Sequence, residues 1–233
     1  MQHPYSVAIL CGGMSRRMGQ DKATMIYQGR PMVCRLAEAF FGAQEVLLSV
    51  RDEEQKNELA EILQRDMLTS PESKVIHRHP LEKGGAQMAY AHPEIMCVVD
   101  PVKGAGPVAG ITAALEACHT EWLFVVAVDM PEMDAAFAEE LFSALNTDSD
   151  NMPATLPGGE AQEICAIVPV ESDGRVHPLA AFYRKDTAVT FANALRDEQY
   201  RVRDVVTEES RLLVRTDRLT DSVRKLQNRN TPE

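Results

Sequence analysis

A basic segment that contains two glycines lies near the amino terminus of this chain. It reads "CGGMSRRMGQDK" and directly follows an apolar run, 5–11. Gly12 and Gly13 carry no Cβ, so their backbone N–H groups can approach an anion closely. The side-chain donors of the segment are Ser15, Arg16, Arg17 and Lys22. Each charge-assisted hydrogen bond contributes ~1.5–3 kcal/mol, so two or three of them could hold a polyphosphate.

The same segment has a simpler explanation. It matches neither the P-loop pattern G-x-x-x-x-G-K-[ST] nor the dinucleotide pattern G-x-G-x-x-G. A solvated arginine pair beside a glycine turn explains the residue types equally well. The formal net charge of −11 does not decide between the two, because salt screens distant charges beyond ~8–10 Å. Residue types alone therefore leave both interpretations open.

Two aspartates stand where predicted strands end. Asp129 closes the apolar run "EWLFVVAVD", and Pro131 prevents that strand from continuing. A carboxylate there suits Mg²⁺, although an aspartate that caps the next helix explains the pattern too. Asp100 closes "IMCVVD", where its oxygens can accept hydrogen bonds from a ribose or from the N–H edge of a purine. Both positions are expected at the ligand-binding edge of a parallel sheet.

Strands and helices alternate along the chain, which predicts β-α-β units and an α/β fold with helices on both faces of a mostly parallel sheet. An antiparallel hairpin over 161–170 and 176–183 is expected to add to this sheet, and Asp134 is expected to cap a helix. The other predicted strands are 5–11, 45–50, 95–100, 121–129 and 211–216. The other predicted helices are 31–41, 52–67, 110–118, 187–197 and 201–207.

Composition limits the function classes. The 233 residues predict a single domain, 1–233, with a nucleotide-binding half at about 1–134 and an acceptor-binding half at about 135–233. The acidic balance argues against nucleic acid as a partner. Five scattered cysteines form no C-x-x-C pair, which is typical of a reducing compartment. No apolar run reaches the ~20 residues that span a bilayer, so a cytoplasmic protein is expected.

Several motifs carry a resemblance to a known family. "LCGGMSRRMGQDKA" closely resembles the nucleotidyltransferase signature L-x-G-G-x-S-x-R-M-G-x-D-K, and within that superfamily it is most similar to the molybdenum cofactor guanylyltransferases. Further matches follow in family order along nearly the whole chain. They are "VVD" to Asp100, "GPVAGI" at 106–111, "VDMP" at 128–131, "HPLAAFY" at 177–183 and "NRNTPE" near the end.

The resemblance implies a three-layer Rossmann-like nucleotidyltransferase fold. It also implies transfer of GMP from GTP to the terminal phosphate of molybdopterin, with release of pyrophosphate and with Mg²⁺ bound by Asp129. Arg16, Arg17 and Lys22 would act on the triphosphate, and Asp100 would lie in the GTP pocket. Residues expected along the guanosine are Leu10, Cys11, Gly12 and Gly13, and residues expected to contact substrate are His177, Asn228 and Asn230. Asn230 would also assist Asp129 with Mg²⁺, by analogy with related nucleotidyltransferases.

Three departures and alternatives accompany the resemblance. Ser49 stands where this family often carries an asparagine, which weakens the assignment of the base. The same chemistry with another nucleotide or acceptor, as in a molybdopterin cytidylyltransferase or a sugar-phosphate enzyme, remains an alternative. So does a non-catalytic protein that delivers the cofactor. The family also implies transient contact with cofactor-insertion proteins or apoenzymes.

Overall fold

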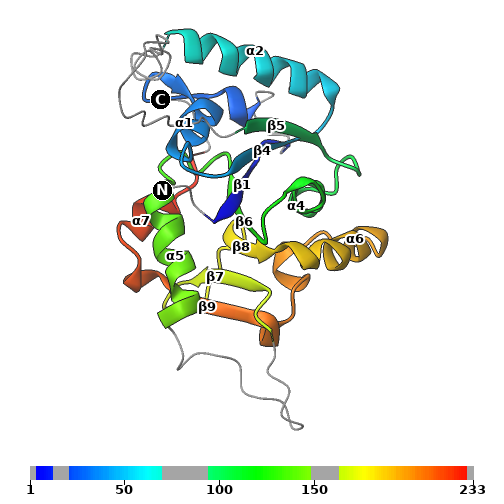
Figure 1. Ribbon diagram of the computed structural model, residues 1–233, viewed down its shortest axis with the longest axis vertical. Coiled ribbons are helices and arrows are strands. Elements are labelled where there is room, and N and C mark those ends of the chain that lie inside the picture. The colour runs from blue at the N-terminus through cyan, green and yellow to red at the C-terminus, as the bar shows by residue number, and fades with distance from the viewer. Residues whose placement is uncertain (1–3, 13–20, 70–93, 148–162, 230–233) are drawn as a thin grey trace, which may run out of the picture.

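The computed structural model describes residues 4–12, 21–69, 94–147 and 163–229. A seven-stranded sheet forms its centre, in the order β5-β4-β1-β6-β8-β7-β9 (Figure 1). These strands are β1 Tyr5–Leu10, β4 Glu45–Val50, β5 Glu94–Val99, β6 Trp122–Ala127, β7 Ala166–Val170, β8 Ala180–Arg184 and β9 Arg211–Arg215. A separate two-stranded sheet pairs β2 Ile26–Tyr27 with β3 Arg30–Pro31. The predicted α/β fold with an antiparallel hairpin is confirmed.

One strand of the described sheet runs against the others. The pairs β1–β4, β4–β5, β1–β6 and β7–β9 are parallel, whereas β8 is antiparallel to both β6 and β7. The carboxyl ends of the other strands therefore meet the amino end of β8 at one edge of the sheet, which we call the carboxyl edge. Val126 pairs with Ala180, so the residues just before β8 lie beside the end of β6.

Helices cover both faces of the sheet, as Figure 1 shows. Alternate residues of β1 explain the two layers: Val7 and Ile9 pack into one apolar cluster, and Ala8 and Leu10 pack into the other. The first cluster includes residues of α1 Met32–Ala39, α2 Glu53–Thr69 and α5 Ala135–Thr147. The second includes residues of α4 Pro107–Ala117 and α6 Ala188–Arg196. The result is the predicted three-layer arrangement.

Most of the predicted elements are present, and one is wrong. The helix predicted over 110–118 begins earlier, at Pro107, and Asp134 caps α5 by accepting a hydrogen bond from the N–H of Phe137 at 2.9 Å. The helix predicted over 201–207 is instead a 3₁₀ turn, Val202–Asp204. A short α-helix, α7 Ser222–Lys225, follows β9. None of the described helices is long and apolar enough to cross a bilayer.

Candidate active site

Backbone hydrogen bonds tie the strand ends together at the carboxyl edge. The N–H of Cys11 donates to the carbonyl of Ser49 at 2.8 Å, and the N–H of Asp100 donates to Val50 at 2.8 Å. The N–H of Val128 donates to Leu10 at 3.2 Å. These bonds extend the sheet beyond its formal ends, so the side chains that follow each strand are held in fixed positions.

A cavity of about 200 Å³ opens at this edge. It contains six of the predicted site residues. They are Leu10, Gly12, Lys22, Asp100, Asp129 and Asn228. Its remaining lining comes from the ends of β4 and β6, the start of α4 and the start of β8. The structure thus brings together residues from the first tenth of the chain and from its last few residues.

Asp100 and Ser49 form one side of the cavity. The Ser49 hydroxyl donates to Asp100 Oδ1 at 2.7 Å, so the residue that departs from the family pattern orients the carboxylate. Burial raises the pKa of Asp100 to about 6, although the bond from Ser49 opposes the shift. A Cβ on Gly12 would lie 2.6 Å from Asp100 Oδ2, and a Cβ on Gly110 would lie 2.3 Å from Ser49 Oγ. Glycine is therefore required at both positions for this arrangement.

Lys22 and Asp129 form a second pair in the lining of the cavity. Lys22 Nζ lies 2.7 Å from Asp129 Oδ2 in a partly buried ion pair. The other carboxylate oxygen, Asp129 Oδ1, is buried and receives no hydrogen bond from the described residues. A buried carboxylate oxygen without a donor fits a bound cation, and Mg²⁺ often uses one or two carboxylates together with phosphate oxygens. No cluster of three or more His, Cys, Asp or Glu side chains that could hold a metal ion occurs among the described residues.

Asp21 fixes the position of Lys22. Its carboxylate caps the 3₁₀ turn Lys22–Thr24 by accepting from the N–H of Ala23 at 3.0 Å. Arg51 and Gln55 donate to its other oxygen at 2.7 and 2.6 Å. These three residues were not among the predicted site residues. The position of Asp21 next to Lys22 in the motif could have indicated its role. No local sequence pattern marks Arg51 or Gln55.

The carboxyl-terminal arm, residues 222–229, lies against Asp129. The N–H of Arg229 donates to the carbonyl of Asp129 at 2.7 Å, and Asn228 lines the cavity beside it. Lys225, which is 4% exposed, pairs with Asp134 at 2.8 Å and holds α7 against the start of α5. This arm therefore lies at the site although it is distant in the sequence.

The remaining predicted site residues lie elsewhere or outside the described residues. Cys11 is fully buried and does not line the cavity: its thiol contacts the carbonyl of Ile9, and its own carbonyl accepts from Gln55. His177 lines a second, adjoining cavity. The predicted residues that fall outside the described ranges are Gly13, Arg16, Arg17 and Asn230.

Several known proteins are similar to this chain in sequence. A probable molybdenum cofactor guanylyltransferase of Methanosarcina acetivorans is 31% identical over 64% of this chain, which spans 56% of that protein, and a Methanosarcina mazei relative is matched over 51% of its length. One of Methanothermobacter thermautotrophicus is 24% identical over 98% of this chain and 95% of its own. The chain thus spans about half the length of the two Methanosarcina relatives.

Several solved structures share the fold. Molybdopterin-guanine dinucleotide biosynthesis protein A of Archaeoglobus fulgidus superimposes with a TM-score of 0.66 at 20% identity, over 97% of this chain and 93% of the other. A 4-diphosphocytidyl-2C-methyl-D-erythritol synthase of Anaerococcus prevotii gives 0.54 at 11% identity, over 91% and 86%. Residues 7–212 match the MobA-like NTP transferase domain. The chain therefore belongs to the MobA-like NTP transferase family.

Proposed function

We propose that this protein transfers GMP from GTP to the terminal phosphate of molybdopterin, forming molybdopterin guanine dinucleotide and pyrophosphate. One observation carries the proposal: the Lys22–Asp129 pair and the Ser49–Asp100 pair line a single cavity at the carboxyl edge. The first pair is suited to phosphates, and the second is suited to the hydroxyl or N–H groups of a nucleoside. Family membership and the names of the relatives support this reading.

The reaction requires an in-line displacement at the α-phosphorus of the nucleotide. A terminal oxygen of the acceptor phosphate forms a new bond to the α-phosphorus. The bond from the α-phosphorus to the oxygen that bridges it to the β-phosphorus breaks, and the electron pair of this bond leaves with pyrophosphate. The second pKa of a phosphate monoester is about 6, so the attacking oxygen is already deprotonated at neutral pH. Catalysis then depends on alignment and charge neutralisation rather than on a general base.

The residues of the cavity divide these tasks. Lys22 carries a positive charge beside the position of the phosphates, and Asp129 offers its buried Oδ1 to a cation. Bound there, Mg²⁺ would neutralise charge on the triphosphate. Asp100 and Ser49 orient the nucleoside through hydrogen bonds. Arg16 and Arg17 are proposed to contact the leaving pyrophosphate.

The identity of the nucleotide needs its own test, because a cytidylyltransferase-like neighbour shares the fold. Pyrophosphate release should be measured with each of the four nucleoside triphosphates, with and without molybdopterin and Mg²⁺. The proposal expects release that requires GTP, molybdopterin and Mg²⁺ together. Turnover with CTP in place of GTP would assign the chain to the cytidylyl branch. GTP binding without any release would favour a delivery protein.

We also propose that the protein works in the cytoplasm. GTP is a cytoplasmic substrate, and all five cysteines are free thiols, as a reducing compartment requires. The product must pass to an enzyme that uses it, so transient contact with insertion proteins or apoenzymes is part of the proposal. Affinity capture with the purified chain, in the presence of its product, would test that contact.

A further inference from the structure

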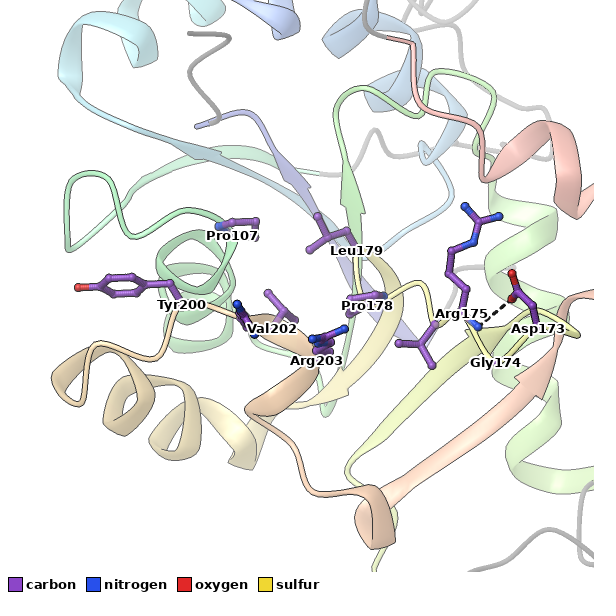
Figure 2. Close-up of a pocket in the computed structure, with 11 residues that line it drawn as sticks. Pro107, Asp173, Gly174, Arg175, Pro178, Leu179, Tyr200, Val202 and Arg203 are labelled. Carbon is purple, nitrogen blue, oxygen red and sulfur yellow. Dashed lines mark hydrogen bonds between the residues drawn. The ribbon is translucent and has the colours of Figure 1, made fainter.

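Two large cavities flank the site on either side of the turn between β7 and β8. The first, of about 670 Å³, lies along residues 171–177, β9 and α7. It includes Asn228, which also lines the cavity of about 200 Å³ at the carboxyl edge, here called the nucleotide cavity. The second, of about 680 Å³, is drawn in Figure 2, and its lining includes Pro178, Leu179, Tyr200 and Arg203. We call them the α7 cavity and the α6 cavity. Both volumes fall within the ~300–1,000 Å³ of small-molecule sites.

The two cavities differ in how they adjoin the Lys22–Asp129 pair, where the reacting phosphates are proposed to lie. The α7 cavity includes Met130, which directly follows Asp129, and it shares Asn228 with the nucleotide cavity. The α6 cavity shares only Pro107 and Leu179 with it and includes neither Lys22 nor Asp129 nor Asn228. A ligand in the α7 cavity would therefore lie beside Met130 and Asn228, and its phosphate would pass these residues to reach the Lys22–Asp129 pair.

A carboxylate with spare acceptor capacity lies in the α7 cavity. Glu171 Oε2 accepts from Arg175 at 2.6 Å, and Glu171 Oε1 lies 2.7 Å from His177 Nε2. The hydrogen bond from Arg175 has the larger effect and that from His177 the smaller, and both lower the pKa of Glu171. The carboxylate is therefore ionised at neutral pH. A carboxylate has about four lone-pair sites, so two remain for a ligand. Glu171 is therefore oriented by protein contacts and still able to bind.

We propose that the α7 cavity holds the ring system of the acceptor, and that Glu171 accepts hydrogen bonds from its amino-pyrimidinone edge. A pterin carries adjacent N–H donors on that edge, and a carboxylate complements two such donors, as it does on a nucleic acid base. Asn228 then lies between the ring and the reacting phosphate. This inference rests on the proposed function, because it assigns a place to the acceptor of that reaction.

The Glu171→Gln variant tests the assignment, with Asp173→Asn as its matched control. Both substitutions remove one negative charge from the same turn and keep the side-chain size. Asp173 lines the α6 cavity, and its Oδ1 accepts from the N–H of Arg175 at 2.9 Å, a bond that asparagine can keep (Figure 2). The glutamine places an amide donor against the ring donors of the acceptor, so it should weaken only the binding of that substrate.

The expected result is a split between kinetic constants. Glu171→Gln should raise KM for molybdopterin by about ten- to a hundredfold, as expected for one lost charge-assisted hydrogen bond, while the Kd for GTP stays within twofold. Asp173→Asn should leave both values unchanged. An unchanged KM in Glu171→Gln, or an equal rise in both variants, would overturn the assignment. Failure of the proposed function would show separately, as absence of GMP transfer to molybdopterin by the unmodified protein.

Discussion

Lys22 already holds one oxygen of the carboxylate that is expected to bind the metal. Its Nζ lies 2.7 Å from Asp129 Oδ2, whereas Oδ1 of the same group is buried without a hydrogen bond from the described residues. A divalent cation that approaches Asp129 alone must therefore compete with an ammonium group. A nucleotide offers that ammonium a replacement, because its phosphates can accept from Lys22 while the metal takes Asp129.

We expect Lys22→Met to bind a divalent cation more tightly when no nucleotide is present. Two unit charges ~4 Å apart interact by about 4 kcal/mol near a protein surface, and partial exposure reduces this. Removal of the ammonium should tighten Mn²⁺ binding by about tenfold, measured by electron paramagnetic resonance. Lys56→Met, which removes an exposed lysine paired with Glu53 at 3.0 Å, is the control and should have no effect. Equal Mn²⁺ affinity in all three proteins would show that Lys22 does not compete.

Asp129→Ala is expected to abolish turnover without unfolding the protein. The variant loses the carboxylate oxygens that we assign to the cation, so kcat/KM for GTP should fall by a factor of about 10³ or more. The carboxylate is 12% exposed and Lys22 is 23% exposed, so the released lysine can reach water. Circular dichroism should therefore show an unchanged fold. A near-normal rate that still depends on Mg²⁺ would place the metal elsewhere.

Asp100→Asn should change how stability depends on pH. Burial raises the pKa of Asp100 from 3.8 to about 6, so between these values the folded protein binds more protons than the unfolded chain. The contribution of Asp100 to the free energy of unfolding therefore falls as pH rises through this window. Above pH 6 the carboxylate is charged, and its desolvation cost is fully present.

Asparagine removes that cost and can still accept from Ser49. We expect Asp100→Asn to be more stable than the unmodified protein by about 1 kcal/mol at pH 7.5, after allowance for solvent screening, and to lose this advantage at pH 4. Urea unfolding at several pH values measures the difference. A difference that does not vary with pH would contradict the raised pKa.

Gly110→Ala should destabilise the protein although alanine is the better helix former. Gly110 lies inside α4, where the substitution would ordinarily stabilise by ~1 kcal/mol. Here the new Cβ would lie 2.3 Å from Ser49 Oγ, so we expect a net loss of about 1–3 kcal/mol. Adding Ser49→Ala removes the clashing oxygen and should recover part of the loss in thermal unfolding. A stabilised single variant would mean that Ser49 moves aside freely.

The sequence predicted the central sheet well because its buried strands are nearly continuous apolar runs. It failed at 201–207, where Val202, Val205 and Val206 have helical spacing but lie in a short connection. All three are buried against the second core cluster, so packing explains their spacing without a helix. An isolated α-helical turn gains few backbone hydrogen bonds for the conformational entropy that it loses, so this short connection forms a 3₁₀ turn and not an α-helix.

The site was predictable where a residue lies just beyond the end of a strand. Asp100 and Asp129 reach the cavity for that reason, and Lys22 reaches it through the adjoining motif. Gln55 was not predictable: it is fully buried in α2 and donates to the carbonyl of Cys11 at 2.9 Å. Glu171 lies in a turn whose sequence resembles any surface turn. Gln55 gains its importance from contacts with distant segments, and Glu171 gains its importance from the cavity that its turn forms with β9 and α7.

The reversed direction of β8 has a consequence for how this architecture can change. Because β8 runs against β6, the turn before it lies at the same edge as Asp129, and the N–H of Ala127 donates to the carbonyl of Leu179 at 3.0 Å. Turns tolerate insertions and deletions far better than buried strands do. If the proposed function holds, acceptor choice would diverge through the length and residues of one hairpin turn while the residues assigned to the nucleotide stay unchanged. Nucleotide choice and acceptor choice would then be separately evolvable.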